Sequence, residues 1–599
     1  MTKYFKNLFG ELSSAPKETP EVAKASSNQT YDLIVIGAGI NGLGIVRDAA
    51  ERGLKVALVE QQDFCYGVSA WSGRLVHGGL RYLEHGDIPL VRESLKEREL
   101  LFRVAPHLVK PVRLIMPFYS RNKRPSWMIR LGMIAYDVLS FDKSVKSHRI
   151  MNKKDVKQRF TGMAEAGLTG AALFTDGQVE YAERLCTELA VAAAEAGADI
   201  YLHSKVTRIL TEGGAATGRV VGIEATKSNG ETLTLNAALT INAGGPWVDA
   251  VLRGEARGSS APNSAIIESK RLMGGSKGSH IIVEPFEGAP NDVVYYESQT
   301  DGRLVLVIPW MGRYLIGTTD RLFDEEPAKA RCEMDEIDYL LTEANTLMPE
   351  AKLTLDDVVY TYSGVRPLPY APGVSEWKIP RSHIVFDHAN SGYPGLHSIV
   401  GGKLTTYRQL AEDSVDLAVK QLGKGARKPV SKKDPFPGAR TADWATFERT
   451  FRATSGFDTD TADRLLALYG TRAQRIADMV KVTPTLAERF DPKSGAVAAE
   501  LIFAVDDEFA ETIADVFARR ILLAFEPGHG LDGLNRASAI LAKHLGWSAG
   551  ERKAQEAGYL EWLDVLRVPT AKKPAGKKPA TKKVAAKKSA ATKPAVAKK

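Results

Sequence analysis

Cysteine is scarce in this 599-residue sequence: only Cys65, Cys186 and Cys332 occur, and they lie far apart. Their spacing matches neither a disulfide framework nor a metal-binding cluster, so we predict no metal site and a reducing compartment. No apolar run approaches the ~18–20 residues that span a bilayer, and the N-terminus lacks the uninterrupted apolar segment of a secretory signal. We therefore expect any membrane contact to be peripheral.

Acidic residues are absent from the stretch Thr570–Lys599, which holds eleven lysines. Without these lysines the formal net charge of +8 becomes −3, so the basic pI is a property of this stretch alone. Its Ala/Lys/Pro composition cannot bury a core, and residues 569–599 are predicted to form a disordered tail. A nucleic-acid-associated protein is one alternative. The acidic body, and the lack of a basic motif with interleaved aromatics, argue instead for no specific nucleic acid.

An apolar strand, a glycine-rich turn, an amphipathic helix and a second strand follow one another over Tyr31–Glu60. Gly37, Gly39 and Gly42 have the G-x-G-x-x-G spacing, which permits a tight turn, close approach of the backbone to a pyrophosphate, and helix–strand packing. Glu60 ends the second strand 23 residues after Gly37, where its carboxylate can accept hydrogen bonds from ribose hydroxyls. The unit predicts binding of FAD or NAD.

Two later segments distinguish between these cofactors. Residues 239–247 read as a strand followed by a turn of small residues, and residues 399–407 as a strand, a diglycine and a helix start. The N-terminus of a helix favours an anion such as a phosphate. A nicotinamide domain is usually contiguous, whereas a large flavoprotein returns to its cofactor from distant segments. FAD is therefore the predicted cofactor.

The two ends of the chain differ in character from its centre. Residues 1–30 are polar and are predicted to be a flexible leader, although Phe5, Leu8, Phe9 and Leu12 have the spacing of a short amphipathic helix suited to membrane contact. Residues 440–568 predict a separate helical domain. Its expected helices include Asp460–Tyr469, Ala496–Val505, Glu508–Phe525 and Ser548–Leu566.

Between Arg121 and Arg159 the sequence has eleven Lys or Arg residues against three Asp, beside apolar residues that include Trp127, Leu131 and Ile134. Such a segment suits an anionic bilayer surface, where each cation contributes about 1 kcal/mol. It equally suits an ordinary buried helix under a solvated basic loop. The sequence leaves both interpretations open.

Five motifs occur in the order found in the FAD-dependent, respiratory sn-glycerol-3-phosphate dehydrogenases, which this sequence resembles from about Tyr31 to about Leu566. They are SGRLVHGGLRYLE (72–84), KGSH (277–280), IGTTD (316–320), YSGVRPL (362–368) and GGKLTTYR (401–408). The resemblance implies oxidation of glycerol 3-phosphate to dihydroxyacetone phosphate, with electrons passing through FAD to membrane quinone. It also implies a cytoplasmic protein held peripherally at an anionic surface of the inner membrane, and a homodimer is a further candidate assembly.

The fold expected from this likeness is α/β. A Rossmann-like FAD-binding domain, mainly 31–100, 180–250 and 380–425, is interleaved with an α+β substrate domain, mainly 101–180 and 251–380. The all-α domain at 440–568 and the basic tail at 569–599 follow. The predicted cofactor contacts are Gly37, Gly39, Asn41, Gly42, Glu60, Ser72, Gly78, Gly79, Val206, Ala243, Gly244, Gly402, Lys403, Leu404 and Thr405.

Substrate contacts follow from the chemistry of a phosphomonoester and from the resemblance. Guanidinium forks match a phosphate dianion, and Arg366 and Arg381 are predicted to hold it. Arg81 and Tyr82 follow the HGG turn that the likeness places against the flavin. Arg81 is expected at the C1 and C2 hydroxyls or at the developing alkoxide.

Hydride transfer from C2 requires removal of the C2 hydroxyl proton, and a group that titrates near neutrality suits that task. His280 is the first candidate for this base and His77 the second. Lys403 is predicted to stabilise negative charge on the reduced flavin. The nearest alternative enzyme is a flavin amine or amino-acid oxidase, which shares the fold but binds a carboxylate and donates electrons to O2.

Overall fold

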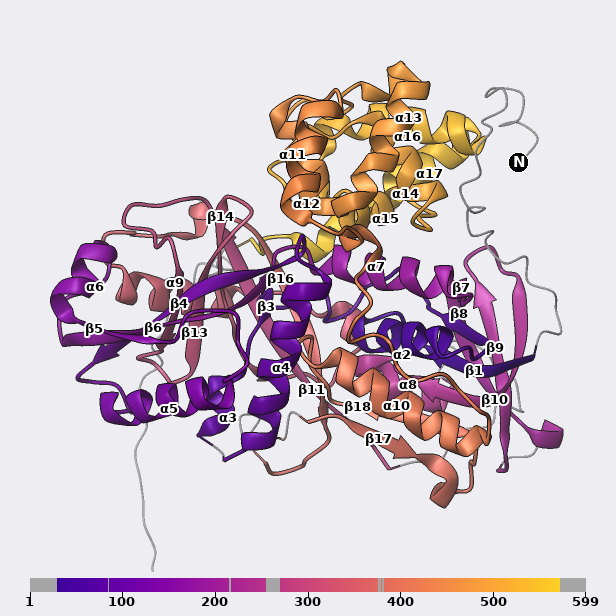
Figure 1. Ribbon diagram of the computed structural model, residues 1–599, viewed down its shortest axis with the longest axis horizontal. Helices are drawn as coiled ribbons and strands as arrows, with labels where there is room; N and C mark the ends of the chain where they lie inside the picture. Colours follow the sequence, from indigo (N-terminus) through magenta and orange to yellow (C-terminus); the bar gives the residue numbers. More distant parts are fainter. Residues whose placement is uncertain are drawn as a thin grey trace, which may run out of the picture.

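Two β-sheets and a cluster of helices make up the computed structural model (Figure 1). The structure describes residues 30–84, 86–214, 217–254, 270–374, 379 and 382–570. The predicted leader and the predicted basic tail therefore lie almost entirely outside the described residues, and so do the apolar positions of the leader.

The first sheet has eight strands in the order β17-β18-β10-β1-β2-β7, and β9 and β8 extend it from β10. β1 pairs in parallel with both β10 and β2, and the chain crosses over through the helix α2. The strands are β1 (Thr30–Ile36), β2 (Val56–Val59), β7 (Asp199–Tyr201), β8 (Ser204–Thr211), β9 (Val220–Lys227), β10 (Thr232–Asn242), β17 (Ile384–Asp387) and β18 (Leu396–Val400). The helices of this part are α2 (Ile40–Glu51), α4 (Ile88–Val104), α7 (Ala182–Glu195), α8 (Val248–Arg253) and α10 (Tyr407–Leu422).

Side chains of β1 alternate between two buried faces, as the pleat of a strand requires. Leu33 and Val35 join a core that contains residues of α2, α7 and α10, whereas Ile34 and Ile36 join a second core with residues of β9 and β10. Burial on both faces explains why the sequence of this strand is a continuous apolar run. Because β1 runs parallel to β2 and β10, the turn that follows it lies at the carboxyl edge of the sheet, where ligands bind in such folds.

The second sheet has ten strands in the order β15-β11-β14-β13-β12-β4-β6-β3, with β16 paired to β11 and β5 paired to β6. Most of its pairs are antiparallel. The strands are β3 (Leu75–Val76), β4 (Val109–Tyr119), β5 (Arg149–Asn152), β6 (Leu168–Val179), β11 (Met273–Val283), β12 (Val293–Glu297), β13 (Leu304–Trp310), β14 (Arg313–Gly317), β15 (Arg321–Leu322) and β16 (Val358–Pro369). The helices around it are α3 (Leu80–Leu83), α5 (Ser126–Leu139), α6 (Lys153–Arg159) and α9 (Met334–Leu347). The chain passes repeatedly between the two sheets, which confirms the predicted interleaving.

Helices dominate the C-terminal region, which lies above both sheets in Figure 1. They are α11 (Trp444–Thr454), α12 (Thr459–Tyr469), α13 (Ala473–Val482), α14 (Ala498–Asp506), α15 (Ile513–Asp515), α16 (Leu531–Leu545) and α17 (Ala549–Trp562), with a 3-10 turn at Leu563–Leu566. Two of the four predicted helices in this domain agree with α12 and α14 to within two residues, the usual uncertainty of a helix end. The helix predicted over Ser548–Leu566 covers α17, which ends four residues earlier at Trp562, and the 3-10 turn that follows it.

The prediction of one continuous helix over Glu508–Phe525 is wrong. Backbone φ is positive at Phe509 (+63°) and Leu522 (+60°), and α15 is followed by a π-helical turn, Val516–Arg520, and a 3-10 turn, Leu523–Phe525. The Arg520 guanidinium donates to the Glu508 carbonyl at 2.8 Å and to both Asp63 carboxylate oxygens at 2.7 Å. These tertiary bonds override the helix propensity of the segment.

Buried ion pairs join the helical domain to the first sheet. Arg184 of α7 donates two hydrogen bonds of 2.6 Å to the Glu508 carboxylate, and neither side chain is exposed. Arg472 donates to Glu508 at 2.6 Å and to Glu188 of α7 at 3.0 Å. Removing one partner of such a pair leaves a buried charge uncompensated, so these contacts fix the relative position of the two parts.

His107 gives this junction a pH-dependent stability. Burial, with Arg184 and Arg472 nearby, lowers the pKa of His107 to about 3 from its ordinary value of 6.5. The unfolded chain therefore binds a proton between these pH values that the folded chain does not bind, so stability is lost as pH falls below 6.5. For this one group we expect a loss of about 2 kcal/mol in the free energy of unfolding between pH 7 and pH 5.

Urea denaturation of the wild type and of His107→Asn at both pH values measures this effect. The variant cannot titrate, so its free energy of unfolding should fall by about 2 kcal/mol less than that of the wild type. His203 is a comparison group whose pKa is shifted in the opposite direction to that of His107. Burial disfavours its charge, but the carboxylate of Asp515 at 2.9 Å raises the pKa of His203 to about 9, so its contribution is lost as pH rises. If the free energy of unfolding changes equally between pH 7 and pH 5 for the wild type and His107→Asn, His107 is not the source of this pH dependence.

Candidate active site

The glycine turn after β1 is as tight as its spacing predicts. Gly37 has φ of +103°, and a Cβ at this position would lie 2.7 Å from the carbonyl oxygen of Ala243. A Cβ on Gly42 would lie 1.9 Å from the carbonyl oxygen of Gly37. Any larger residue at either position would therefore push the turn, α2 and the end of β10 apart. The second predicted cofactor segment, at Ala243, is thus in direct contact with the first.

Side chains from neighbouring loops hold the N-terminus of α2. The Ser69 hydroxyl accepts a hydrogen bond of 3.0 Å from the amide of Ile40. Glu60, at the end of β2, accepts one bond of 2.7 Å from the amide of Ala38 and one of 2.9 Å from the amide of Gln62. Burial raises the pKa of Glu60, while these two amides oppose the rise. A carboxylate has about four acceptor positions, so Glu60 retains capacity for hydroxyl donors.

A cavity of about 250 Å³ opens at this edge of the sheet. Its walls include six of the predicted cofactor residues: Gly37, Gly39, Glu60, Val206, Ala243 and Gly244. Asn41 and Gly402 lie against each other nearby, since a Cβ on Gly402 would be 2.7 Å from the Asn41 amide nitrogen. The Asn41 amide oxygen is buried with no hydrogen-bond partner in the structure, as expected of a group that faces a polar ligand. The residues present therefore fit a dinucleotide.

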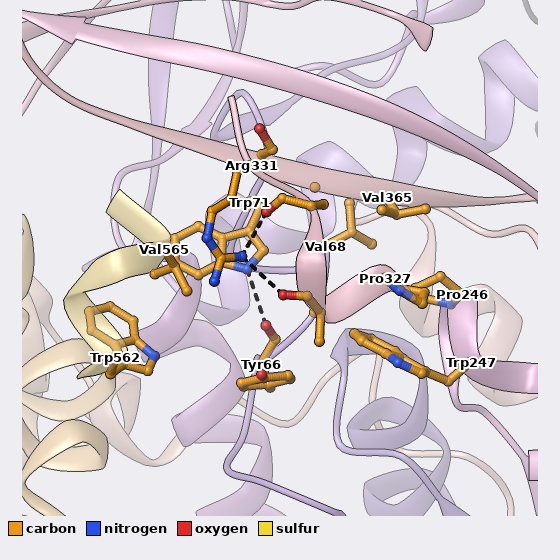
Figure 2. A pocket seen from close by; sticks show the side chains of 15 residues that line it. Tyr66, Val68, Trp71, Pro246, Trp247, Pro327, Arg331, Val365, Trp562 and Val565 are labelled. Carbon is orange, nitrogen blue, oxygen red and sulfur yellow. Dashed lines mark hydrogen bonds between the residues drawn. The ribbon is translucent and has the colours of Figure 1, made fainter. Parts of the chain in front are cut away.

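The loop after β2 separates this cavity from the helical domain. Tyr66, Val68 and Trp247 line the cavity and also a second, smaller recess of about 30 Å³ (Figure 2). Trp71 donates its indole N–H to the Tyr66 carbonyl at 3.2 Å, and its ring stacks on Trp562 of α17 at 6.3 Å between centroids. The helical domain thus supports the loop that bounds the cofactor cavity.

One face of the pair β11 and β16 carries the predicted phosphate and base residues. Ser276, Gly278 and His280 alternate along β11, and Arg366 of β16 lies directly opposite Ser276. A Cβ on Gly278 would lie 2.2 Å from the Arg366 guanidinium. A Cβ on Gly317 of β14 would likewise lie 2.2 Å from the His280 ring. The glycines of KGSH and IGTTD therefore make room for these two side chains.

Arg366 is held in place by four hydrogen bonds. Its guanidinium donates to the Ser276 hydroxyl at 3.2 Å, the Asp320 carboxylate at 3.0 Å, the Thr318 hydroxyl at 3.0 Å and the Thr319 carbonyl at 3.2 Å. About a fifth of the side chain is exposed, at 21%. The fork is therefore oriented before any substrate arrives, and Asp320 competes with an incoming anion for it.

His280 is almost fully buried beside this fork. Its ring packs on Tyr362 at 5.0 Å between centroids, and the Tyr362 hydroxyl donates to the Ser72 carbonyl at 2.7 Å. Burial, with Arg366 and Arg74 nearby, lowers the pKa of His280 to about 3. The expectation of a group that titrates near neutrality is therefore wrong for this structure. The ring is therefore neutral at physiological pH, the form that can accept a proton, and the same burial and arginines make it a weaker base than a free imidazole.

A second group of predicted residues meets at the turn after β3. The ammonium of Lys403 lies 3.8 Å from the centre of the Tyr82 ring, a cation–π contact. The Thr405 hydroxyl donates to the His77 carbonyl at 3.4 Å. Burial and the charge of Lys403 lower the pKa of His77, although Asp176 opposes this. The segment 402–405 is thus brought against the segment 77–82 over more than 300 residues of sequence.

Three residues that the sequence analysis did not single out support this turn. The Gly78 amide donates to the Tyr136 hydroxyl at 3.0 Å and to Asp176 at 3.2 Å. Tyr136 in turn donates to Asp176 at 2.8 Å, and Arg98 binds Asp176 at 2.6 Å. Nothing local in the sequence marks these residues, because they come from α5, β6 and α4 and meet only in the fold.

A further network lies on the opposite face of β11. Glu336 of α9 is fully buried and accepts hydrogen bonds from the hydroxyls of Ser279, at 3.0 Å, and Thr319, at 2.7 Å. The Lys277 ammonium lies 2.9 Å from the same carboxylate. These bonds hold the segment that carries Thr318 and Asp320 toward Arg366. The lysine and serine of KGSH therefore have a supporting role.

The structure does not describe the side chains of two predicted substrate residues, Arg81 and Arg381. Arg381 lies outside the described residues, and the side chain of Arg81 is not described, although its backbone belongs to α3. Within the described ranges, no group of three or more His, Cys, Asp or Glu residues is arranged to hold a metal ion.

Comparisons with known proteins identify the family of this chain. A family model for FAD dependent oxidoreductases matches residues 32–408, and a model for the C-terminal domain of alpha-glycerophosphate oxidase matches residues 429–552. The glycerol-3-phosphate dehydrogenase of Synechocystis sp. is 42% identical over 546 residues, which are 90% of this chain and 98% of that protein. The aerobic glycerol-3-phosphate dehydrogenase of Staphylococcus haemolyticus is 31% identical over 521 residues, 85% of this chain and 89% of the relative.

Among solved structures, the glycerol-3-phosphate dehydrogenase from Bacillus halodurans complexed with FAD matches with a TM-score of 0.72 and 27% identity. The match covers 90% of this chain and 96% of that one. The predicted fold class and the predicted cofactor, FAD, are both confirmed. Since the two family models match in order and the relatives align over nearly the whole chain, this protein belongs to the family of FAD-dependent glycerol-3-phosphate dehydrogenases.

Proposed function

We propose that this protein oxidises sn-glycerol 3-phosphate to dihydroxyacetone phosphate and that the electrons leave through FAD to a membrane quinone. The observation that carries the proposal is the placement of Arg366 and His280 on one face of β11 and β16, joined through Tyr362 to the segment at Ser72. An anion-binding fork and a neutral imidazole on one surface suit a phosphorylated alcohol. The names of the relatives support the same substrate.

Each residue then has one task in the reaction. Arg366 and Arg381 bind the phosphate, and Arg81 and Tyr82 hold the hydroxyl end. His280 accepts the proton from the C2 hydroxyl while the C2 hydrogen leaves as a hydride. The substrate thereby loses two electrons and two protons in total, and its C2–O single bond becomes a carbonyl. When bound, FAD supplies the acceptor for that hydride. Lys403 contributes positive charge next to the His77 turn.

The proposed acceptor places the protein at the cytoplasmic side of the inner membrane, against an anionic lipid surface. The described residues contain no helix with the length and apolarity to cross a bilayer. We propose a peripheral attachment. Homodimer formation stays a separate proposal, which sedimentation equilibrium of the purified protein tests.

Flavin spectroscopy tests the proposed reaction. Purified protein should show the absorption bands of bound FAD, and anaerobic sn-glycerol 3-phosphate should bleach them, because the C2 hydride reduces the flavin. Glycerol and amino acids at the same concentration serve as controls for an oxidase of the same fold. Bleaching by an amino acid but not by glycerol 3-phosphate would contradict the proposal.

The electron acceptor needs its own measurement. Turnover with a soluble quinone analogue should greatly exceed the rate of peroxide release in air-saturated buffer. Peroxide formed in stoichiometric amounts, at a rate that matches substrate loss, would assign the electrons to O2 instead.

A further inference from the structure

One residue of the cofactor cavity comes from the second-sheet region. Of the described residues around this cavity of about 250 Å³, all but one belong to the first sheet, to the turn at 37–39, or to the segments 60–69 and 243–251. The exception is Glu326, which lies between β15 and α9. The wall of the cofactor cavity therefore includes a single described side chain from the region that carries the proposed substrate residues.

A hydrogen bond joins Glu326 to the first-sheet region. The indole N–H of Trp247 donates to the Glu326 carboxylate at 2.6 Å, and both residues line the cavity. A hydrogen bond to an ionised acceptor is roughly twice as strong as one between neutral groups. The indole has one donor and no acceptor, so the Trp247 side chain has no further polar atom to offer the cofactor. The bond connects two residues that are 79 positions apart in the sequence.

The ring of Trp247 has a fixed position. A Cβ on Gly67 would lie 3.1 Å from this ring, and the Tyr66 ring lies 6.1 Å from it between centroids. Figure 2 shows Trp247 and Pro327, the residue after Glu326, around the smaller recess that they both line. The loop after β2 therefore holds the indole, and its N–H keeps one orientation.

The glutamate belongs to a segment, residues 323–331, that is anchored at both ends. At the first end the Phe323 amide donates to the carbonyl of Gly275 in β11 at 3.0 Å. At the other end the Arg331 guanidinium donates at 3.1 Å to the carboxylate of Asp564, in the 3-10 turn after α17. These anchors leave the middle of the segment to be held by its own contacts.

Few contacts hold the middle of this segment. Its exposed side chains are at positions 324, 325, 328 and 329. An ion pair joins Asp324 to Arg271 at the surface, where such pairs contribute little. A segment with few buried apolar contacts opens locally at low cost in free energy. The bond from Trp247 to Glu326 is therefore the main polar contact that keeps the segment closed against the cavity.

We propose that the hydrogen bond between Trp247 and Glu326 is a latch on the cofactor cavity. FAD enters and leaves when the segment 323–331 moves away from Trp247, and the closed bond slows both steps. Donor and acceptor both belong to the protein and satisfy each other, so the bond adds to the barrier for exchange and not to the affinity for FAD. The latch concerns cofactor exchange alone and does not depend on which substrate is oxidised.

Exchange of the cofactor tests the latch on the full-length holoenzyme. Holoenzyme is mixed with a large excess of isotope-labelled FAD, and mass spectrometry of the protein-bound cofactor gives the release rate. Trp247→Phe keeps a ring against Gly67 but removes the N–H. It should release FAD about tenfold faster or more, as expected for the loss of a hydrogen bond to a charged group. Glu326→Gln keeps an uncharged acceptor and should release FAD about threefold to tenfold faster. An unchanged release rate for Trp247→Phe would overturn the proposal.

The affinity for FAD separates a latch from an ordinary contact to the cofactor. The holoenzyme is diluted in steps to equilibrium, and the fluorescence of free FAD gives the dissociation constant of each variant. Since a latch acts on both entry and release, this constant should stay within about threefold of the wild type while release becomes faster. A dissociation constant that rises in step with the release rate would show that Trp247 or Glu326 holds FAD directly, and the latch would be wrong.

Two further variants show whether the bond itself is responsible. Glu325→Gln removes the same charge one residue away, on an exposed side chain outside the cavity lining, and should leave the release rate within about twofold of the wild type. Trp247→Phe/Glu326→Gln should release FAD no faster than Trp247→Phe, because the bond is already lost in the single variant. Effects that multiply in the double variant would assign them to two separate contacts and contradict the latch.

The urea dependence of release tests whether FAD leaves through unfolding. Opening one short segment exposes little surface, so the logarithm of the wild-type release rate should change with urea much less steeply than that of the rate of global unfolding. The same slope for both rates would mean that FAD leaves only when the protein unfolds, and would rule out the latch. None of these measurements uses a substrate or an electron acceptor, so they are independent of the proposed reaction.

Discussion

Replacing Arg366 with alanine should lower kcat/KM for sn-glycerol 3-phosphate by about 10²- to 10³-fold, the range expected when one partner of a largely buried charged contact is removed. The guanidinium is oriented by Ser276, Thr318, Thr319 and Asp320 before substrate binds. Its loss removes two charge-assisted hydrogen bonds that only a fork can offer to a phosphate. Steady-state kinetics with a soluble quinone analogue, at fixed pH and ionic strength, measures the effect.

Two control variants separate phosphate binding from support of the fold. Arg366→Lys keeps the charge but loses the fork, so it should recover only part of kcat/KM. Asp320→Asn still holds the guanidinium by a hydrogen bond and no longer competes as an anion. Its KM for glycerol 3-phosphate should stay the same or fall.

Glycerol is the comparison substrate for this series. Because it lacks the phosphate, Arg366→Ala should change its slow turnover by less than threefold if the guanidinium acts on the phosphate. Equal losses for glycerol and glycerol 3-phosphate would show that Arg366 only supports the segment of Thr318 and Asp320.

Local spacing was sufficient to predict the glycine turn that borders the cavity at the edge of the first sheet. The spacing of Gly37, Gly39 and Gly42 in the sequence reflects contacts within one turn and one helix, so a local sequence pattern is enough to predict it. The return of residues 243–244 to that turn was also predictable, because the end of a buried parallel strand must lie at the same edge of the sheet.

The proposed substrate site depends on the register between distant strands. His280 faces Gly317 and Tyr362 only because β11 pairs with β14 and β16 in one particular alignment. The sequence offers the motifs but not the alignment, and the ion pair of Arg366 with Asp320 was therefore not foreseen. The low pKa of His280 has the same origin, since it results from burial by three strands and the approach of two arginines.

Tertiary contacts also decided two regions that local patterns described incompletely. Arg520 donates hydrogen bonds to Asp63 and to the Glu508 carbonyl, and the helix expected over Glu508–Phe525 is broken into shorter turns. For α5 the sequence left open a segment suited to a bilayer surface and an ordinary buried helix. The structure shows a helix with one apolar stripe buried, at Ile129, Met133 and Tyr136, and a second one exposed, at Trp127, Leu131, Ile134 and Val138. Which of its two apolar stripes is buried depends on Tyr136 and Asp176, which are 40 residues apart in sequence.

Replacing His280 with asparagine should slow reduction of the bound FAD by glycerol 3-phosphate about 10²- to 10⁴-fold, the usual contribution of a positioned general base. Asparagine is uncharged and close in size, so the packing on Tyr362 should largely persist. Substrate should still bind through Arg366, which leaves its dissociation constant within about threefold of the wild type. Anaerobic stopped-flow spectroscopy gives both quantities from the dependence of the reduction rate on substrate concentration.

The pH dependence distinguishes a base from a merely structural imidazole. Since the pKa of His280 is lowered to about 3, the wild-type ring stays neutral at pH 5–8, and the rate of reduction at saturating substrate should show no ionisation of this group there. A general base lost by mutation makes the reaction depend on hydroxide or water, so the rate for His280→Asn should rise with pH over the same range. His77→Asn, at the Gly78 turn, is the matched variant. A large loss for His77→Asn together with an unchanged rate for His280→Asn would move the proton acceptor to His77.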